Sequence, residues 1–181
     1  MTERLLLHTC CAPCGIAVID ELRKSYDLSV LFYNPNIFPE EEYLKRKREV
    51  IRVCGEWDIP MIDADYEPDA WGEAIRGLEG EPEGGRRCPV CFRSRLFRSA
   101  EIAAERGFPV FATTLTSGRN KRDDIISPIG DAAAAKVGVR FLAEDWKKGG
   151  RQEAARKMVC ERGIYRQDYC GCRYSLAERG S

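Results

Sequence analysis

The sequence predicts one α/β domain built on a parallel sheet that is covered by helices on both faces. Short apolar runs alternate with longer segments whose apolar residues recur at helical spacing, which is the pattern of repeated strand–helix units. The 181 residues, 44% of them hydrophobic and 32% charged, are enough for one buried core. No internal repeat breaks the pattern, so we expect residues 1–181 to form a single domain.

The first half of the chain opens with two strand–helix units. Residues 4–9 are a short apolar run and predict a strand, and the helix predicted at 14–25 follows with isoleucine and leucine at helical spacing. A second strand, at 28–33, is stopped by an Asn-Pro-Asn turn. Residues 39–55 are highly charged but open on a proline, which suits the first turn of a helix.

The same alternation continues to the end of the chain. Residues 59–64 predict a third strand and 71–78 a short helix. We interpret the acidic, glycine-rich residues 79–85 as a surface loop rather than a domain boundary, because the pattern resumes unchanged after them. A long helix is predicted at 88–106, ended by Gly107. The remaining elements are a strand at 110–115, a helix at 124–137, a strand at 140–142 and a helix at 151–161.

Apolar patterning argues against a membrane protein or a secreted one. The longest apolar runs, such as residues 5–7 and 16–19, are far too short to cross a bilayer, so we expect no membrane partner. No basic region followed by a long apolar segment opens the sequence, as a secretory signal would. We therefore expect a cytoplasmic protein, in which clustered cysteines bind metal or do redox work more often than they form disulfides.

The net charge of zero conceals a division along the chain. Residues 1–85 carry 9 basic and 18 acidic side chains, and residues 86–181 carry 20 basic and 11 acidic ones. Either the surface is simply polarised, or a basic rim attracts an anionic partner such as tRNA. Several arginines lie near the cysteine clusters: Arg86, Arg87, Arg93, Arg95, Arg98, Arg166 and Arg173.

Cysteines carry the strongest chemical signal in this sequence. Seven of the nine fall into three clusters near the start, middle and end of the chain: Cys10, Cys11 and Cys14; Cys88 and Cys91; Cys170 and Cys172. One zinc ion or one [4Fe–4S] cluster takes only four protein thiolates. Seven therefore fit one four-thiolate cluster plus a second iron with three, with zinc as the alternative for any pair of clusters. We predict that Cys54 and Cys160, alone within helices, are small core residues.

Polar and cysteine residues follow three of the predicted strands at their carboxyl ends. In parallel α/β sheets these ends share one edge, where ligand sites form, so we expect one composite site. The first strand is followed by Cys10, Cys11 and Cys14, the second by Tyr33, Asn34 and Asn36, and the fourth by Thr113, Thr114, Thr116, Ser117 and Arg119.

The spacing within each cluster constrains how it can bind metal. Cys88 and Cys91 are three apart on a predicted helix, so both thiols lie on one face. Cys14 is expected in a first helical turn, where free N–H groups favour a thiolate. We expect the adjacent side chains of Cys10 and Cys11 to diverge and to serve two neighbouring centres. His8, the only histidine, is either a packed strand residue or a hydrogen-bond donor to a metal ligand.

Five motifs in the same order resemble the epoxyqueuosine reductases of the QueH type. They cover nearly the whole chain, and the terminal Cys-Gly-Cys makes the set specific. The motifs begin at His8 (HTCCAPC), Phe32 (FYNPNIFP), Arg87 (RCPVC), Thr113 (TTLTS) and Tyr165 (YRQDYCGC).

The resemblance implies a fold similar to the adenine-nucleotide hydrolases and the last step of queuosine biosynthesis. That step is the cobalamin-independent reduction of epoxyqueuosine to queuosine in tRNA. The resemblance also implies a [4Fe–4S] cluster beside an additional iron, and an external electron donor. An open iron site suits a Lewis acid for the epoxide oxygen, and a cluster suits the delivery of single electrons. We expect Cys10 and Cys11 to act in catalysis.

The remaining polar residues of the predicted site have alternative roles. Tyr33, Tyr165 or Tyr169 can donate a proton or simply satisfy a buried hydrogen bond. Asn34 and Asn36 can bind the diol or base, or stabilise the turn after the strand. Candidates for phosphate contacts are Arg119, Lys121, Arg166 and Arg173. Candidates for stacking or packing are Trp71 and Trp146.

Three other functions compete with epoxide reduction. An ATP-dependent tRNA thiolase would need a glycine-rich loop after the first strand, where this chain has Cys10 to Cys14 instead. A zinc module that only binds RNA would contain zinc without iron or sulfide. A thiol oxidoreductase would place its Cys-x-x-Cys in a βαβ unit, which the pair Cys88 and Cys91 does not match.

Overall fold

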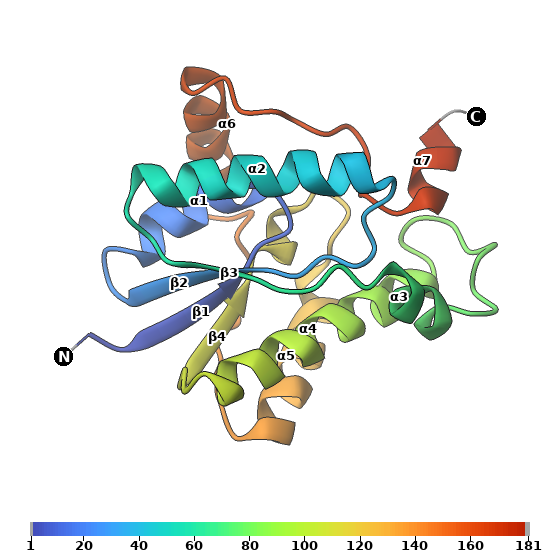
Figure 1. The fold of residues 1–181 in the computed structure, drawn as a ribbon, viewed down its shortest axis with the longest axis horizontal. Helices are drawn as coiled ribbons and strands as arrows, with labels where there is room; N and C mark the ends of the chain where they lie inside the picture. Colours follow the sequence, from blue (N-terminus) through green and yellow to red (C-terminus); the bar gives the residue numbers. More distant parts are fainter. Residues whose placement is uncertain (1, 180–181) are drawn as a thin grey trace.

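The described residues, 2–179 of a computed structural model, are arranged around one sheet of five parallel strands (Figure 1). The strand order is β3-β2-β1-β4-β5, so β1 lies in the centre. The chain adds β2 and β3 on one side of β1 and then β4 and β5 on the other, which makes the gap between β1 and β4 the topological switch point of the sheet. The predicted parallel α/β class is confirmed. The strands are β1 (Arg4–His8), β2 (Asp27–Phe32), β3 (Met61–Asp63), β4 (Val110–Thr113) and β5 (Arg140–Phe141).

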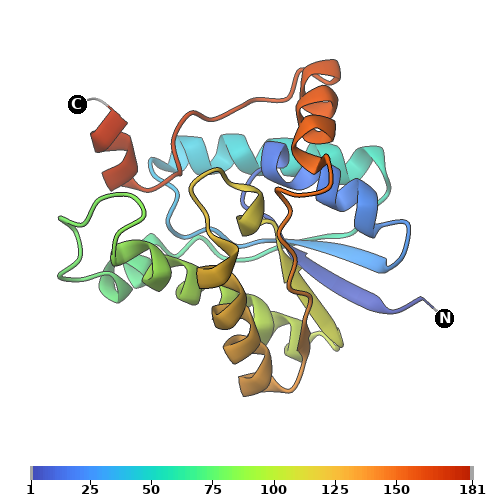
Figure 2. The same cartoon turned by 180° about the vertical axis from the view of Figure 1, so that it is seen from behind.

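Helices cover both faces of this sheet, as the sequence predicted. Figures 1 and 2 show α1, α2 and α6 on one face and α4 and α5 on the other. The helices are α1 (Ala12–Leu22), α2 (Glu40–Glu56), α3 (Pro68–Ala74), α4 (Arg87–Glu105), α5 (Asp123–Val137), α6 (Arg151–Glu161) and α7 (Arg173–Arg179), with a 3-10 turn, η1 (Leu115–Ser117).

The central strand divides its side chains between two cores. Leu5 and Leu7 pack with Ile16 of α1, whereas Leu6 packs with Leu96 of α4. Alternate residues of a strand point to opposite faces, so a fully apolar strand requires helices on both sides. In register, His8 lies opposite Leu31 of β2 and Thr113 of β4, so these three strands end at one edge.

The observed elements differ from the predicted ones where prolines and short polar segments intervene. Helix α3 begins at Pro68 rather than residue 71, since proline is favoured in a first turn. Helix α7 was not predicted, because seven mostly polar residues carry little periodic signal. In addition, α7 lies beside the acidic loop, where the Glu83 N–H donates to Glu178 Oε1 at 3.1 Å (Figure 1).

One of the two isolated cysteines is not a core residue. Cys54 is buried, as predicted, but Cys160 is exposed on α6. Val159 is the one buried residue of helix α6. Cys160 follows it directly, and successive residues of a helix point in different directions, so Cys160 points away from the core. The prediction for Cys160 was therefore wrong.

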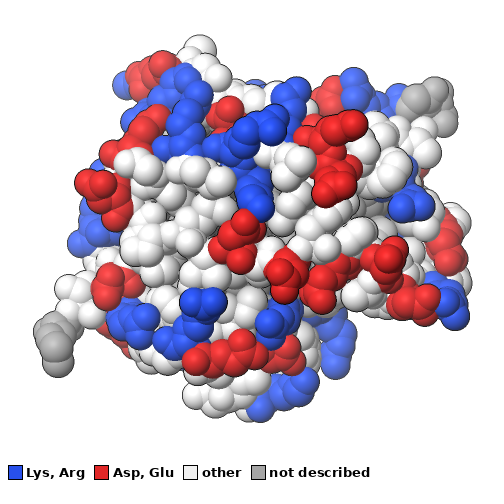
Figure 3. Space-filling view, viewed as in Figure 1, with Lys and Arg blue, Asp and Glu red and all other residues white. Residues whose placement is uncertain are grey.

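Charges that are divided along the sequence are mixed on the surface. Figure 3 shows basic and acidic side chains interspersed on the face seen in Figure 1. Both halves of the chain contribute strands to the same sheet, so the two halves are not separate bodies. Two of the arginines proposed for a basic rim, Arg87 and Arg95, are buried and cannot belong to it.

Candidate metal centre

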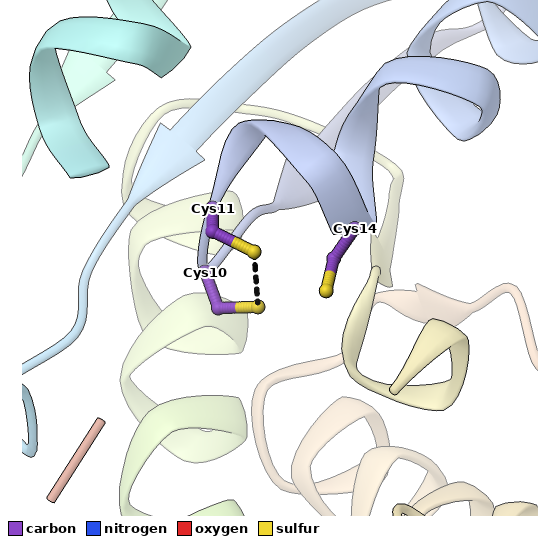
Figure 4. Close-up of side chains that lie close together, drawn as sticks. All are labelled: Cys10, Cys11 and Cys14. Atoms are coloured by element: carbon purple, nitrogen blue, oxygen red, sulfur yellow. Dashed lines mark hydrogen bonds between the residues drawn. The ribbon is translucent and has the colours of Figure 1, made fainter. Parts of the chain in front are cut away.

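Three cysteines that follow β1 bring their sulfur atoms together. Cys10 and Cys11 lie in the turn between β1 and α1, and Cys14 lies in the first turn of α1. Their Sγ atoms all lie within 4.8 Å of one another, and Figure 4 shows the three side chains facing one another. This cysteine triad has the arrangement needed to hold one metal ion.

The side chains of Cys10 and Cys11 converge, which contradicts the prediction that they diverge. Their Sγ atoms are 3.8 Å apart. Successive side chains diverge along a regular strand, but Cys11 is the N-cap of α1 and has an extended backbone with φ −169° and ψ 158°. The chain changes from strand to helix at this point, and that change brings both sulfurs to the same side.

Protons are unequally shared within the triad. Hydrogen bonds with Cys11 and Cys14 lower the pKa of Cys10 well below its ordinary value, despite burial. The bond with Cys10 raises the pKa of Cys11 to about 12, and it raises the pKa of Cys14 as well. The three thiols therefore differ in how readily they lose a proton, and a bound metal ion would displace the protons that remain.

Four more cysteines line a second, much smaller cavity. Cys88 and Cys91, one turn apart in α4, meet Cys170 and Cys172 of the C-terminal segment there. Cys170 also lines the large cavity that Cys10 and Cys14 border. The three clusters, at the start, middle and end of the chain, thus converge on one region.

Hydrogen-bond donors point at the sulfur atoms in three places. The Gly84 N–H donates to Cys88 Sγ at 3.2 Å, and the Ser175 N–H donates to Cys172 Sγ at 3.4 Å. Gln167 Nε2 donates to Cys11 Sγ at 2.8 Å. Such donors stabilise thiolates and orient them as ligands. The sequence analysis had no role for Gln167, and its position three residues before Cys170 was the only available signal.

Helix α2 holds the C-terminal cysteine segment in place. Arg46, which is buried, donates to the carbonyl oxygens of Cys170 at 3.0 Å and Tyr169 at 3.3 Å. Glu42 accepts from Arg46 Nε at 2.7 Å and from the Tyr165 hydroxyl at 2.9 Å. The sequence analysis missed this pair, because a Glu and an Arg four apart in a charged helix usually lie on its solvated face.

A large cavity of about 660 Å³ opens beside the sulfur atoms. Its wall includes Cys10, Cys14 and Cys170, and three of the predicted phosphate contacts, Arg119, Lys121 and Arg166. The fourth, Arg173, instead lies over the ring of Phe38, at 4.6 Å from the ring centroid. Further basic residues in the wall are Arg46, Arg151 and Arg156.

Two cations act directly on the thiols. Burial lowers the pKa of Lys121, but coulombic interaction with Cys170 and Cys10 outweighs it and raises that pKa above its ordinary value. For Arg95, burial likewise lowers the pKa, and thiolates led by Cys91 reverse the shift. Negative sulfur and positive nitrogen therefore stabilise one another here.

Several predicted site residues lie in the core instead of on the cavity walls. Asn34 Nδ2 donates to the Thr9 carbonyl at 3.0 Å, and the Tyr33 hydroxyl donates to Glu67 Oε2 at 3.2 Å. His8 Nε2 donates to the Tyr33 carbonyl at 3.0 Å. Burial lowers the pKa of His8 to about 4, so its ring is neutral. The bonds of Asn34 and His8 tie the ends of β1 and β2 together next to the turn that carries Cys10 and Cys11.

Other predicted residues border the site. Asn36 lines the small cavity, and its buried Oδ1 has no hydrogen-bond partner. The Thr114 hydroxyl lies 3.9 Å from Cys10 Sγ. Trp71 and Trp146 are both buried, and Trp146 Nε1 donates to the Thr113 carbonyl at 2.8 Å. Trp146 borders the large cavity and Trp71 the small one.

Comparison with known proteins identifies the family. Residues 5–178 match the family model described as "Epoxyqueuosine reductase QueH". The chain belongs to the QueH family. The resemblance found in the motifs is thereby confirmed, and this QueH chain is an oxidoreductase.

Curated QueH relatives align with almost the whole chain. The epoxyqueuosine reductase QueH of Histophilus somni is 44% identical over 178 residues, covering 97% of this chain and 73% of the relative. The QueH of Acinetobacter baylyi is 43% identical, covering 97% and 82%. The QueH of Thermotoga maritima is 36% identical, covering 97% and 91%.

A solved structure shares the fold of this QueH chain. It is a "predicted subunit of tRNA methyltransferase" from Methanocaldococcus jannaschii, with a TM-score of 0.51 and 10% identity over 91% of each chain. At this identity the likeness concerns the fold alone. Within residues 2–179, no helix is both long and apolar enough to cross a membrane.

The donor set fits iron–sulfur chemistry in kind and number. Thiolates are the protein ligands of iron–sulfur clusters, and four of them line the small cavity of this QueH chain. The triad supplies three further thiols to a neighbouring metal position. Within residues 2–179, this triad is the group of Cys, His, Asp or Glu side chains whose ligand atoms all lie close enough together to hold one metal ion.

Proposed function

We propose that this chain reduces epoxyqueuosine to queuosine in tRNA, the last step of queuosine biosynthesis, and that it does so without cobalamin. The observation that carries the proposal is the convergence of seven thiols beside a large basic cavity in a member of the QueH family. We further propose that the enzyme works in the cytoplasm, where its tRNA substrate is found.

Two neighbouring metal positions follow from the two groups of thiols. Cys10, Cys11 and Cys14 would hold the additional iron. When bound, the two centres would supply single electrons and a Lewis acid for the epoxide oxygen. The four ligands of the [4Fe–4S] cluster would be Cys88, Cys91, Cys170 and Cys172.

The large cavity has the properties needed to bind the modified nucleoside. Its volume of about 660 Å³ lies within the range of pockets that hold small ligands. Enzymes that modify a base in a nucleic acid take that base out of its stack and bind it in such a pocket. Arg119, Lys121 and Arg166 would bind the flanking phosphates. The nucleoside would then lie against the sulfur side of Cys10 and Cys14.

The reaction consumes two electrons and two protons and releases the epoxide oxygen as water. An external one-electron donor must supply the electrons. All three tyrosines predicted as proton donors have engaged hydroxyls: those of Tyr33 and Tyr165 donate to carboxylates, and that of Tyr169 donates to the Phe38 carbonyl. Of the three, Tyr169 lines the large cavity. Burial raises the pKa of Tyr169 to about 12, so it carries its proton at neutral pH.

Anaerobic purification followed by a single reaction tests the proposal. Iron and sulfide are measured, and the protein is incubated with epoxyqueuosine tRNA and a chemical reductant. We expect queuosine to form, and its formation to fall at least 100-fold in Cys11→Ala and Cys172→Ala. Cys160→Ala is the matched control, because it removes an exposed thiol that lines neither cavity.

Two results would overturn this function. Unchanged turnover in both site variants would show that the thiols are not needed. Zinc without iron or sulfide in the purified protein would favour an RNA-binding zinc module instead.

A further inference from the structure

Arg95 is a buried cation for which the structure provides no carboxylate. It lies in α4, one turn after Cys91, and is 1% exposed. Within residues 2–179, no Asp or Glu oxygen comes within ion-pair distance of it, whereas the equally buried Arg46 pairs with Glu42 and Arg87 lies near Glu178. A buried, unpaired guanidinium is costly, so something else must balance its charge.

The hydrogen bonds of Arg95 do not satisfy its guanidinium. Its Nε donates to the Cys91 carbonyl at a long 3.4 Å, and the ring centroid of Phe92 lies 5.7 Å from its guanidinium carbon. Its Nη2 is buried and has no hydrogen-bond partner in the described part of the chain. This side chain lines the small cavity.

Cysteines of all three clusters act electrostatically on Arg95. The charges that act most strongly on it are those of Cys91, Cys170 and Cys10. Cys88 and Cys172 line the same small cavity. The guanidinium is therefore placed where negative charge gathers as soon as the thiols are deprotonated by a metal centre.

We propose that Arg95 is the fixed counter-charge of the cysteine-bound cluster and that it raises the reduction potential of that cluster. This inference rests on the proposed function, in which four thiolates hold a [4Fe–4S] centre. Four thiolates and a 2+ core carry a charge of −2, and uptake of one electron from a low-potential reductant makes it −3 with no bond or proton change. A buried positive charge stabilises the second state more than the first.

The test compares three variants on α4 after reconstitution with iron and sulfide. Arg95→Gln removes the charge, Arg95→Lys keeps it, and Arg98→Gln removes a charge from a partly exposed site on the same helix. Metal and sulfide contents are measured first. The midpoint potential is then determined by anaerobic titration with dithionite, followed by electron paramagnetic resonance.

We expect Arg95→Gln to bind the cluster, but the equilibrium constant for reducing that cluster should fall at least tenfold. For a one-electron step this is a shift of the midpoint potential by about 59 mV to lower values. Arg95→Lys should recover most of the shift, and Arg98→Gln should match the wild type. A loaded Arg95→Gln protein with an unchanged potential would overturn the proposal.

A variant that fails to load the cluster is also informative. If Arg95→Gln loses iron and sulfide, Arg95→Lys decides the matter: restored loading supports a role for the charge, and failure to load contradicts it. None of these measurements uses tRNA. A wild-type protein that binds zinc rather than iron would instead refute the proposed function, so the two failures are distinguishable.

Discussion

At the scale of single residues, Gly171 is the position where backbone geometry most directly limits the site. Its φ is +138°, a conformation that side chains with a Cβ rarely adopt. A Cβ there would lie 3.1 Å from Arg46 Nη1 and 3.3 Å from Ile37 Cγ1. The residue between Cys170 and Cys172 must therefore be glycine for both thiols to reach one cavity.

We predict that Gly171→Ala lowers the stability of the protein by about 1–3 kcal/mol through backbone strain and also reduces the iron and sulfide content. Thermal unfolding and metal analysis check the two effects. Gly138→Ala is the control, because Gly138 has a φ of +75° at the end of α5 with open space around it. It should lose stability but keep its metal. Full iron and sulfide in Gly171→Ala would contradict the prediction.

At the scale of elements, α2 acts as the support for the C-terminal cysteine segment. The Phe38 N–H, just before this helix, donates to the Gly171 carbonyl at 2.8 Å. Arg46 adds its bonds to the carbonyls of Cys170 and Tyr169, and Glu42 holds Arg46 in position. A segment of irregular backbone is thus fixed by a regular helix that belongs to the other end of the chain.

We predict that Arg46→Met destabilises the fold by about 3–5 kcal/mol, because it leaves Glu42 as an unpaired and nearly buried carboxylate. The double variant Glu42→Gln/Arg46→Met should recover part of this loss, with a coupling of about 1–3 kcal/mol. Chemical unfolding of the four proteins of the cycle measures it. Arg48→Met, exposed on the same helix, serves as the control. Strict additivity of the two changes would refute the pairing.

At the scale of the whole molecule, the sheet topology gathers basic residues at one edge, even though charges are mixed on the face seen in Figure 3. Arg119 and Lys121 follow β4, and Arg166 follows α6, yet all three border the same large cavity. The surface in Figure 3 shows no comparable separation of charge. Affinity for tRNA should therefore depend on this edge and not on the overall net charge.

We predict that Arg119→Ala and Arg166→Ala each weaken tRNA binding and each reduce the slope of log K against log salt by about 1, as the loss of one phosphate contact does. Filter binding over a range of salt concentrations measures this slope. Arg140→Ala is the control, since Arg140 begins β5 at the opposite edge and pairs with Glu3. Equal slopes in all four proteins would place the tRNA elsewhere.

Much of the fold was predictable because its signals are local. The apolar run at Leu5 to Leu7 and the helical spacing from Ile16 onward are readable in a few residues each, and both elements formed where they were expected. Cys14 reached the first helical turn for the same reason. The family motifs were equally local, and they identified the chain.

The finer structure of the site was less predictable. Arg95 and Arg98 look alike in the sequence, yet one faces the thiols and the other pairs with Glu101 and Glu105 on the surface. Cys10 and Cys11 converged because a strand meets a helix between them. Cys160 points outward because α6 buries so narrow a face.

Residue order and periodicity were enough to establish alternating strands and helices, the two-sided burial of the central strand and an enzyme family rich in clustered cysteines. Packing determined which thiols share a cavity, which cation lies unpaired among them and which helix supports the C-terminal segment. The reason is physical: periodicity is a property of neighbouring residues, whereas contacts such as Arg46 with Cys170 join positions 124 apart and exist only once the sheet has brought them together.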